Sequence, residues 1–170
     1  MADTGYELVA SFFTLTGAGF GEQPRYSFVE RCRAAADAGF TGIGLHADDL
    51  PRTVASGLSV AGMQAVLADT GLRVVEIEFM GGWALEADPA EVERMVGRIE
   101  AVADAFGGRH VSAGEFRGDA SINLDAAAAR LDALAQRLAQ PACRLPWRGF
   151  PGRRSPAPPP CRSCYGGLTR

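Results

Sequence analysis

The sequence predicts an α/β fold in which parallel strands alternate with helices. Four short segments rich in bulky apolar residues begin near residues 8, 42, 72 and 109. Their spacing of roughly 30 to 37 residues is the length of one strand–helix unit. Helix-capping residues mark the segments between them. The composition is that of a globular protein, since 47% of the 170 residues are hydrophobic and 22% are charged.

The spacing of apolar residues and the helix-capping residues predict the strands and helices of the first two units. Residues 7–13 are expected to form a strand, residues 26–38 an amphipathic helix and residues 41–46 a second strand. A further helix is expected from the cap Ser59 to about residue 69, and Gly71 ends it. The first helix should bury Phe28, Val29, Cys32, Ala35 and Ala36 and leave more exposed Glu30, Arg31, Arg33 and Asp37.

The next two units follow the same logic. Residues 72–79 are expected to form the third strand and residues 109–113 the fourth. Between them, Asp88 and Pro89 give an N-cap followed by proline at the first helical position, and that helix should run to about residue 106. A last helix, rich in alanine and leucine, is expected to begin at Asn123 or Asp125 and to end near Gln140.

A change of composition divides the chain into residues 1–140 and 141–170. The last thirty residues hold seven of the ten prolines, and no acidic residue follows Asp132. Prolines at this density block helices and strand ladders, so we expect an irregular tail. A second hypothesis is that the tail is a fifth strand read in a shifted frame, because a two-base shift in residues 141–148 permits Gly-Leu-Pro-Val-Ala-Leu-Glu. The nucleotide sequence tests it.

Several classes of function are disfavoured by composition. A net charge of −3 argues against a nucleic-acid-binding protein, and the lack of lysine excludes a Schiff-base lysine. No apolar run is long enough for a membrane span, and no basic segment resembles a secretory signal. Four cysteines in such a chain suggest free thiols in a reducing, cytoplasmic setting. A zinc site at Cys161 and Cys164 lacks further ligands.

Polar residues stand where the predicted strands end. His46 ends the second strand, Glu78 and then Trp83 follow along the third, and Glu115 follows the fourth. Ligands of parallel α/β folds bind at the carboxyl ends of strands, which predicts catalytic roles for His46 and Glu78. Trp83 and Glu115 are predicted to bind substrate.

Each residue also has a structural interpretation. His46 could be a hydrogen-bonded histidine at a strand end, and Glu115 a solvated loop acid. Trp83 could pack a lid or form a wall against an apolar sugar face. Glu76 and Glu78 should share one face of their strand, with Glu76 a structural acid. Asp48 and Asp49 are expected to solvate or cap their loop.

Three segments resemble the sugar phosphate isomerase/epimerase family, the xylose-isomerase-like TIM barrels. They are residues 35–46, 71–79 and 104–111, which follow the pattern of a helix, A-G-F-x-G-I-x-L, a helix and G-L-x-V-x-E. The resemblance implies that the alternating elements form about four of the eight units of a (β/α)₈ barrel rather than a doubly wound sheet. The predicted fold class is therefore a partial TIM barrel with an irregular tail.

The resemblance also implies a chemistry, the isomerisation or epimerisation of a small sugar-like substrate. Family members use a divalent metal (Mn, Mg or Zn) held by acids and a histidine from about the fifth strand onward, so we expect this chain to bind none. Its own activity is then doubtful. The alternative is a non-catalytic half-barrel that binds small molecules or self-associates, for example as a homodimer through the open barrel side.

Overall fold

The structure is a computed structural model that describes residues 7–19, 22–85, 88–115 and 122–139. The predicted tail at 141–170 lies outside these residues. The elements follow one another in the order β1 Val9–Ala10, α1 Phe12–Leu15, α2 Phe28–Asp37, β2 Gly42–His46, α3 Asp49–Ala55, α4 Val60–Thr70, β3 Arg73–Met80, α5 Pro89–Phe106, β4 His110–Ala113 and α6 Leu124–Ala139.

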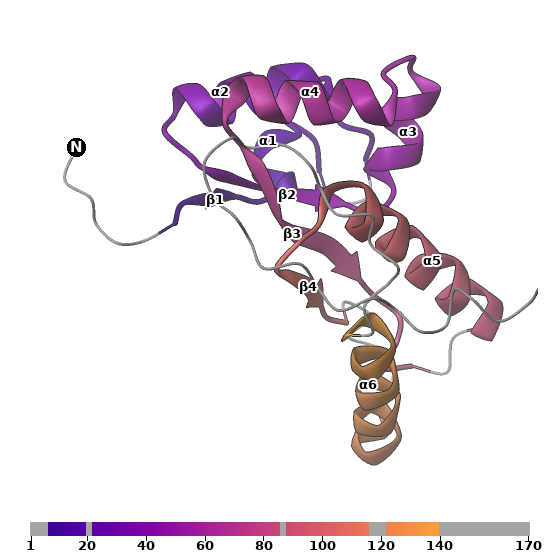
Figure 1. Cartoon of the computed structure of the whole chain (residues 1–170). Helices are drawn as coiled ribbons and strands as arrows, with labels where there is room; N and C mark the ends of the chain where they lie inside the picture. The colour runs from indigo at the N-terminus through magenta and orange to yellow at the C-terminus, as the bar shows by residue number, and fades with distance from the viewer. Residues whose placement is uncertain (1–6, 20–21, 86–87, 116–121, 140–170) are drawn as a thin grey trace, which may run out of the picture.

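The four strands form one sheet in the order β1-β2-β3-β4, and every neighbouring pair is parallel. This confirms the predicted α/β architecture of a partial barrel. Figure 1 shows α2 and α4 side by side near β1 and β2, with α5 alongside β3 and α6 beyond β4. The core lies between the sheet and these helices, and its centre is formed by the fully buried side chains of Cys32, Leu45, Met63, Val96, Ile99 and Val102.

Local sequence signals account for the helix ends. Ser27 and Glu30 form a reciprocal capping box at the start of α2, and Ser59 caps α4 through the N–H of Gly62. Asp88 is the N-cap of α5, as predicted, and its side chain accepts a hydrogen bond from the N–H of Ala90. Pro89 occupies the first helical position. Gly71 adopts φ +67° where α4 ends, a conformation that glycine reaches without strain. The predicted helices therefore begin and end within about two residues of those observed.

Strand 1 is shorter than predicted. Only Val9 and Ala10 pair with β2, and the chain turns into α1 at Phe12. The reason is a competing acceptor, because the Phe12 N–H donates to the side chain of Glu78 at 2.7 Å rather than to a neighbouring strand. That interaction spans 66 residues of sequence, so the apolar pattern of residues 7–13 could not show it.

The segment after β2 also differs from the prediction. Asp49 was expected in a solvated or capping position, but it opens the short helix α3 and is only 2% exposed. Arg31, expected on the exposed side of α2, is 5% exposed. The two side chains form a buried ion pair at 2.7 Å, and this pair explains both corrections. On the predicted buried side of α2, Phe28, Cys32 and Ala35 are buried, whereas Val29 and Ala36 are only partly buried.

Two glycines of β2 leave space above one face of the sheet. A Cβ at Gly42 would lie 2.6 Å from the side chain of Val75, and a Cβ at Gly44 would collide with the carboxyl of Glu78. Because Gly42 and Gly44 are two residues apart, they share a face of the strand. Val75 and Glu78 therefore lie over the same face of the sheet. Residues three apart in a regular strand would lie on opposite faces, and an irregularity in the β2–β3 register accounts for the exception. Among the described residues, no helix is long and apolar enough to cross a membrane.

Candidate functional site at the strand ends

His46 and Glu78 lie at the same level of adjacent strands. They are register partners at the carboxyl ends of β2 and β3. The two residues predicted to be catalytic are therefore brought together at one edge of the sheet. In parallel α/β folds this is the edge at which ligands bind.

Glu78 is a buried carboxyl held by neutral donors. It is 4% exposed, and it accepts from the Phe12 N–H at 2.7 Å and from the Ser11 hydroxyl at 3.1 Å. Burial raises the pKa of Glu78 above its usual range, and the neighbouring Glu76 raises it further, while the two donors oppose the shift. Glu76 therefore lies close enough to Glu78 to interact with it. Glu78 can therefore hold or release a proton closer to neutral pH than an ordinary carboxyl.

His46 is held as a neutral imidazole. Its Nδ1 accepts a hydrogen bond from the Asp48 N–H at 3.1 Å, so in this arrangement the ring proton resides on Nε2. Burial lowers the pKa of His46, while the carboxylate of Asp48 acts in the opposite direction. Within the described ranges no hydrogen bond is made to Nε2. His46 is thus arranged as a neutral hydrogen-bond donor.

Phe12 contacts both of these residues. Its N–H donates to Glu78, and its ring centroid lies 5.3 Å from that of His46. The guanidinium of Arg31 lies 5.2 Å from the centre of the same ring. Arg31 is fixed in turn by its ion pair with Asp49, three residues beyond His46. The Arg31–Asp49 ion pair and the ring of Phe12 therefore help to fix the position of His46 and Glu78.

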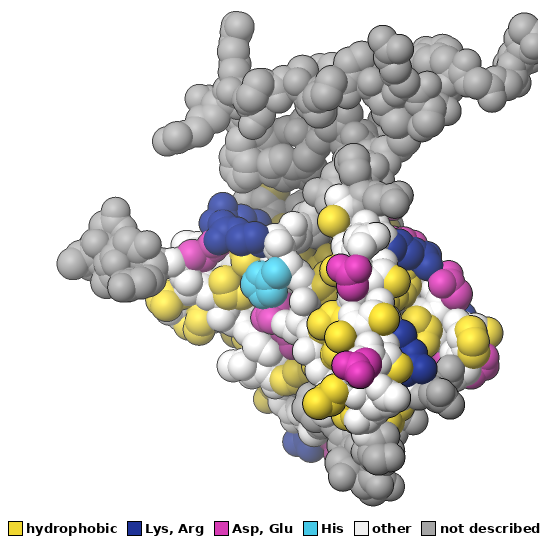
Figure 2. All heavy atoms as spheres, turned by 90° about the horizontal axis from the view of Figure 1, so that it is seen from below, with side chains coloured by type: hydrophobic (Ala, Val, Ile, Leu, Met, Phe, Trp, Pro, Cys, Tyr) yellow, Lys and Arg dark blue, Asp and Glu magenta, His cyan; other side chains and the backbone are white. Residues whose placement is uncertain are grey.

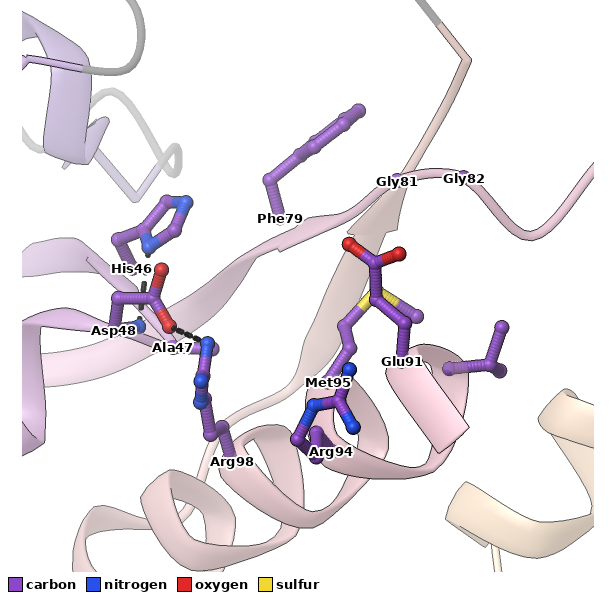
Figure 3. Close-up of a pocket in the computed structure, with 11 residues that line it drawn as sticks. His46, Ala47, Asp48, Phe79, Gly81, Gly82, Glu91, Arg94, Met95 and Arg98 are labelled. Carbon is purple, nitrogen blue, oxygen red and sulfur yellow. Dashed lines mark hydrogen bonds and ion pairs between the residues drawn. The ribbon is translucent and has the colours of Figure 1, made fainter. Parts of the chain in front are cut away.

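A cavity of about 370 Å³ opens beside His46, within the size range of small-molecule sites. We call it the rim cavity. Figure 3 shows that it lies between the ends of β2 and β3 and the first half of α5. Its principal walls are formed by His46, Asp48, Phe79, Glu91, Arg94 and Arg98. Arg98 projects from α5 and pairs with Asp48 at 2.5 Å, which joins the helix to the end of β2.

The α5 residues of the rim cavity were missed by sequence reasoning. Glu91, Arg94 and Arg98 were not singled out, although their spacing of three, four and seven residues places them on one helix face. That spacing was the available signal. On its own it could not identify a site, because nothing local shows that the end of β2 lies against this helix face.

Trp83 and Glu115 do not line the rim cavity, and neither does Glu78. Trp83 is partly buried and packs against the hydrophobic core, and its Nε1 has no hydrogen-bond partner among the described residues. Glu115 lies just beyond β4 and is half-buried. The structure therefore brings His46 and Glu78 together. The substrate-binding roles of Trp83 and Glu115 stay predictions.

The described residues do not fit the divalent metal that the resemblance implies. Across residues 7–19, 22–85, 88–115 and 122–139, no three His, Cys, Asp or Glu side chains gather closely enough to hold a metal ion. The best candidates near the site, Glu76 and Glu78, face neutral hydroxyl and N–H donors instead.

Positive and negative side chains are mixed on the surface. On the face in Figure 2, arginine side chains lie near acidic ones, and hydrophobic side chains are scattered between them. The ion pairs repeat this mixing, since Arg73 and Arg109 both contact Glu7, and Arg137 contacts Glu93 and Glu100. Among the described residues of this face there is no broad basic area of the kind that binds nucleic acid.

The fold and this edge define the first half of a (β/α)₈ barrel, and two solved structures are similar to it. One is a xylose isomerase-like TIM barrel/4-hydroxyphenylpyruvate dioxygenase fusion protein, with 17% identity and a TM-score of 0.55 over 76% of this chain. The other is 3-keto-D-glucoside 4-epimerase from E. coli in its apo form, with 16% identity and a TM-score of 0.51 over 78% of this chain.

These similarities concern the fold. This chain spans 19% of the fusion protein and 51% of the epimerase. No family model and no curated protein matches the sequence. The structural likeness to xylose-isomerase-like TIM barrels agrees with the resemblance carried by the sequence motifs.

Proposed function

We propose that this chain is the N-terminal half of a sugar isomerase or epimerase barrel, and that its strand ends bind a sugar-like ligand through His46 and Glu78. The register that places these residues at one level of β2 and β3 is the observation that carries the proposal. His46 donates a hydrogen bond to a sugar oxygen from Nε2. Glu78 accepts or returns a proton at a carbon or hydroxyl of the ligand.

The environments of the two residues suit these roles. A neutral imidazole can donate to a carbonyl or hydroxyl oxygen without placing a net charge beside it. A buried carboxyl whose pKa is raised is a better general acid at moderate pH, and a stronger base once it is ionised, than a solvated one. The resemblance to the sugar phosphate isomerase/epimerase family implies a divalent metal, which would polarise the sugar oxygens. The described residues do not hold it, so turnover is proposed only for a complete barrel.

The binding half of the proposal is tested by calorimetric titration with a panel of ketoses and aldoses. We expect millimolar binding that weakens about tenfold or more in His46→Phe and in Glu78→Gln. The control is His110→Gln, because His110 is the other histidine and lies at the opposite end of its strand. Unchanged affinity in both site variants, or no binding by the intact chain, would contradict the proposal.

The second candidate is a half-barrel that self-associates. Within the described sheet, β1 and β4 are each paired on one side only. Unpaired strand edges favour pairing with a second copy. We expect light scattering after size-exclusion chromatography to give a dimer or larger species. A folded, soluble monomer would count against this candidate, whereas sugar turnover by the chain with Mg²⁺ or Mn²⁺ would reject a purely non-catalytic function.

A further inference from the structure

A second hollow adjoins the rim cavity and differs from it in chemistry. We call it the helix groove. It is also about 370 Å³, and it runs between α3 and α5 with walls formed by Leu50, Pro51, Val54, Val60, Gly97 and Ala101. Ala47, Arg94 and Arg98 line both hollows. The two are therefore neighbours that share a wall, one polar and one apolar.

The rim cavity is balanced in charge. It contains two guanidiniums, those of Arg94 and Arg98, and two carboxylates, those of Asp48 and Glu91. The imidazole of His46 uses its Nδ1 internally, which leaves it neutral. A phosphate or carboxylate would meet two carboxylates at close range, and a cation would meet two guanidiniums. Charge complementarity thus favours an uncharged group with many hydroxyls, such as an unphosphorylated sugar ring.

The helix groove is suited to an apolar group. Val54 is 44% exposed although it faces other apolar side chains, and Leu50 is buried beside it. The groove exists because α5 presents small residues here, Gly97 and Ala101, one helical turn apart. A Cβ built at Gly97 would have no heavy atom within 4 Å, so the space above this glycine is open. Filling it would remove apolar surface from water.

We propose that the ligand of this site is an uncharged glycoside, with its sugar ring in the rim cavity beside His46 and an apolar aglycone in the helix groove over Gly97. This inference rests on the proposed function through His46, the one of its two site residues that lines the rim cavity, and it adds the class of sugar derivative. It also assigns the binding role of α5, whose Arg94 and Arg98 form the boundary between the two parts of the ligand.

The test compares three probes by calorimetry: methyl β-D-glucopyranoside, phenyl β-D-glucopyranoside and glucose 6-phosphate. The phenyl glucoside should bind about tenfold more tightly than the methyl glucoside, because its ring is removed from water in the groove. The phosphate ester should bind no more tightly than the methyl glucoside. Phenol alone should bind more weakly than the phenyl glucoside.

Gly97→Leu fills the groove without touching the rim cavity, since Gly97 lines only the groove. Leucine is a better helix former than glycine and has open space here, so the variant should fold with an equal or higher melting temperature. It should lose the tenfold advantage of the phenyl glucoside while keeping the affinity for the methyl glucoside. Ala65→Leu, at an exposed position of α4 outside both hollows, is the matched control and should keep the advantage.

The outcomes separate the two proposals. If both glucosides bind equally, or if the phenyl advantage survives in Gly97→Leu, the aglycone site is wrong while the sugar site stands. If glucose 6-phosphate binds more tightly than the methyl glucoside, the uncharged head group is wrong. If neither glucoside binds but other sugars do, the glycoside is wrong, and if no sugar binds at all, the proposed function has failed.

Discussion

Two buried carboxyls, Asp49 and Glu78, are nearly equal in exposure and opposite in surroundings. Asp49 is 2% exposed and Glu78 is 4% exposed. Asp49 faces the guanidinium of Arg31 at 2.7 Å, so its charge is compensated. Glu78 faces an N–H, a hydroxyl and a second carboxyl, and among the described residues no cation forms an ion pair with it.

The difference distinguishes a carboxyl that stabilises the fold from one that is suited to proton transfer. A carboxylate paired with arginine can hold two helices together, and here it joins α2 to α3. A carboxyl that is buried without a cation changes its proton affinity instead. Burial alone therefore does not identify a functional acid, and the partner decides. Substitutions in the two regions should therefore differ in their effects.

The largest effect is expected for Asp49→Ala. The substitution leaves the guanidinium of Arg31 buried without its counter-charge, which should lower the free energy of unfolding by about 3–5 kcal/mol. Urea denaturation followed by circular dichroism measures it. Replacing both partners, in Arg31→Met with Asp49→Leu, should recover most of the loss. If the single and double variants are equally unstable, the ion pair is not the cause.

A smaller loss is expected for Gly44→Ala. The new Cβ would collide with the Glu78 carboxyl and would lie 3.0 Å from the Phe12 nitrogen. Overpacking of this kind should cost about 1–3 kcal/mol of stability. In a Glu78→Ala background the cost should fall, because the main obstacle is gone. Equal costs in both backgrounds, measured by a double-mutant cycle, would show that Glu78 does not occupy the space above Gly44.

Glu78→Gln should change how stability depends on pH. Because the folded-state pKa of Glu78 is raised above 4.5, the unfolded chain loses this proton first as the pH rises. The contribution of Glu78 to stability is therefore fully present below about pH 4.5 and is lost as the pH rises through the raised pKa. Relative to Glu78→Gln, the unaltered chain should become less stable across that window. A pH-independent difference between the two chains would contradict the neutral-donor environment.

The smallest effect is expected at His46, which is only partly buried. Burial lowers the pKa of His46 below 6.5, so the folded chain takes up this proton later than the unfolded chain as the pH falls. The stability it contributes is present above pH 6.5 and is lost as the pH falls through the lowered pKa. Proton NMR of the His46 ring should give a midpoint below 6.5, and His46→Gln should remove the corresponding pH dependence. A midpoint at or above 6.5 would contradict the lowering of this pKa by burial.

The sequence predicts best what is decided within a few residues. The ends of α2, α4 and α5 follow from Ser27, Ser59 and Asp88, which act on N–H groups within three residues of themselves. The parallel sheet follows from the repeated spacing of strands and helices. The level shared by His46 and Glu78 could also be predicted, because it needs only the rule that side chains gather at the carboxyl ends of parallel strands.

What the sequence could not predict depends on contacts between distant residues. The helix α1 replaces part of the first strand because of an acceptor 66 residues away. The burial of Arg31 depends on Asp49, which lies on another helix. The rim cavity depends on Arg98 reaching Asp48 across 50 residues. Neither the hydrophobic periodicity, nor the helix-capping residues, nor the composition identifies these partners. Only the folded structure shows which charged residues pair.

The double contact of Phe12 has a practical consequence. Its backbone N–H donates to Glu78, while its ring lies near both the imidazole of His46 and the guanidinium of Arg31. A fluorine atom on this ring would report both titrations as changes in a single resonance. The same label would register the arrival of a ligand at the strand ends without any alteration of the groups that contact it.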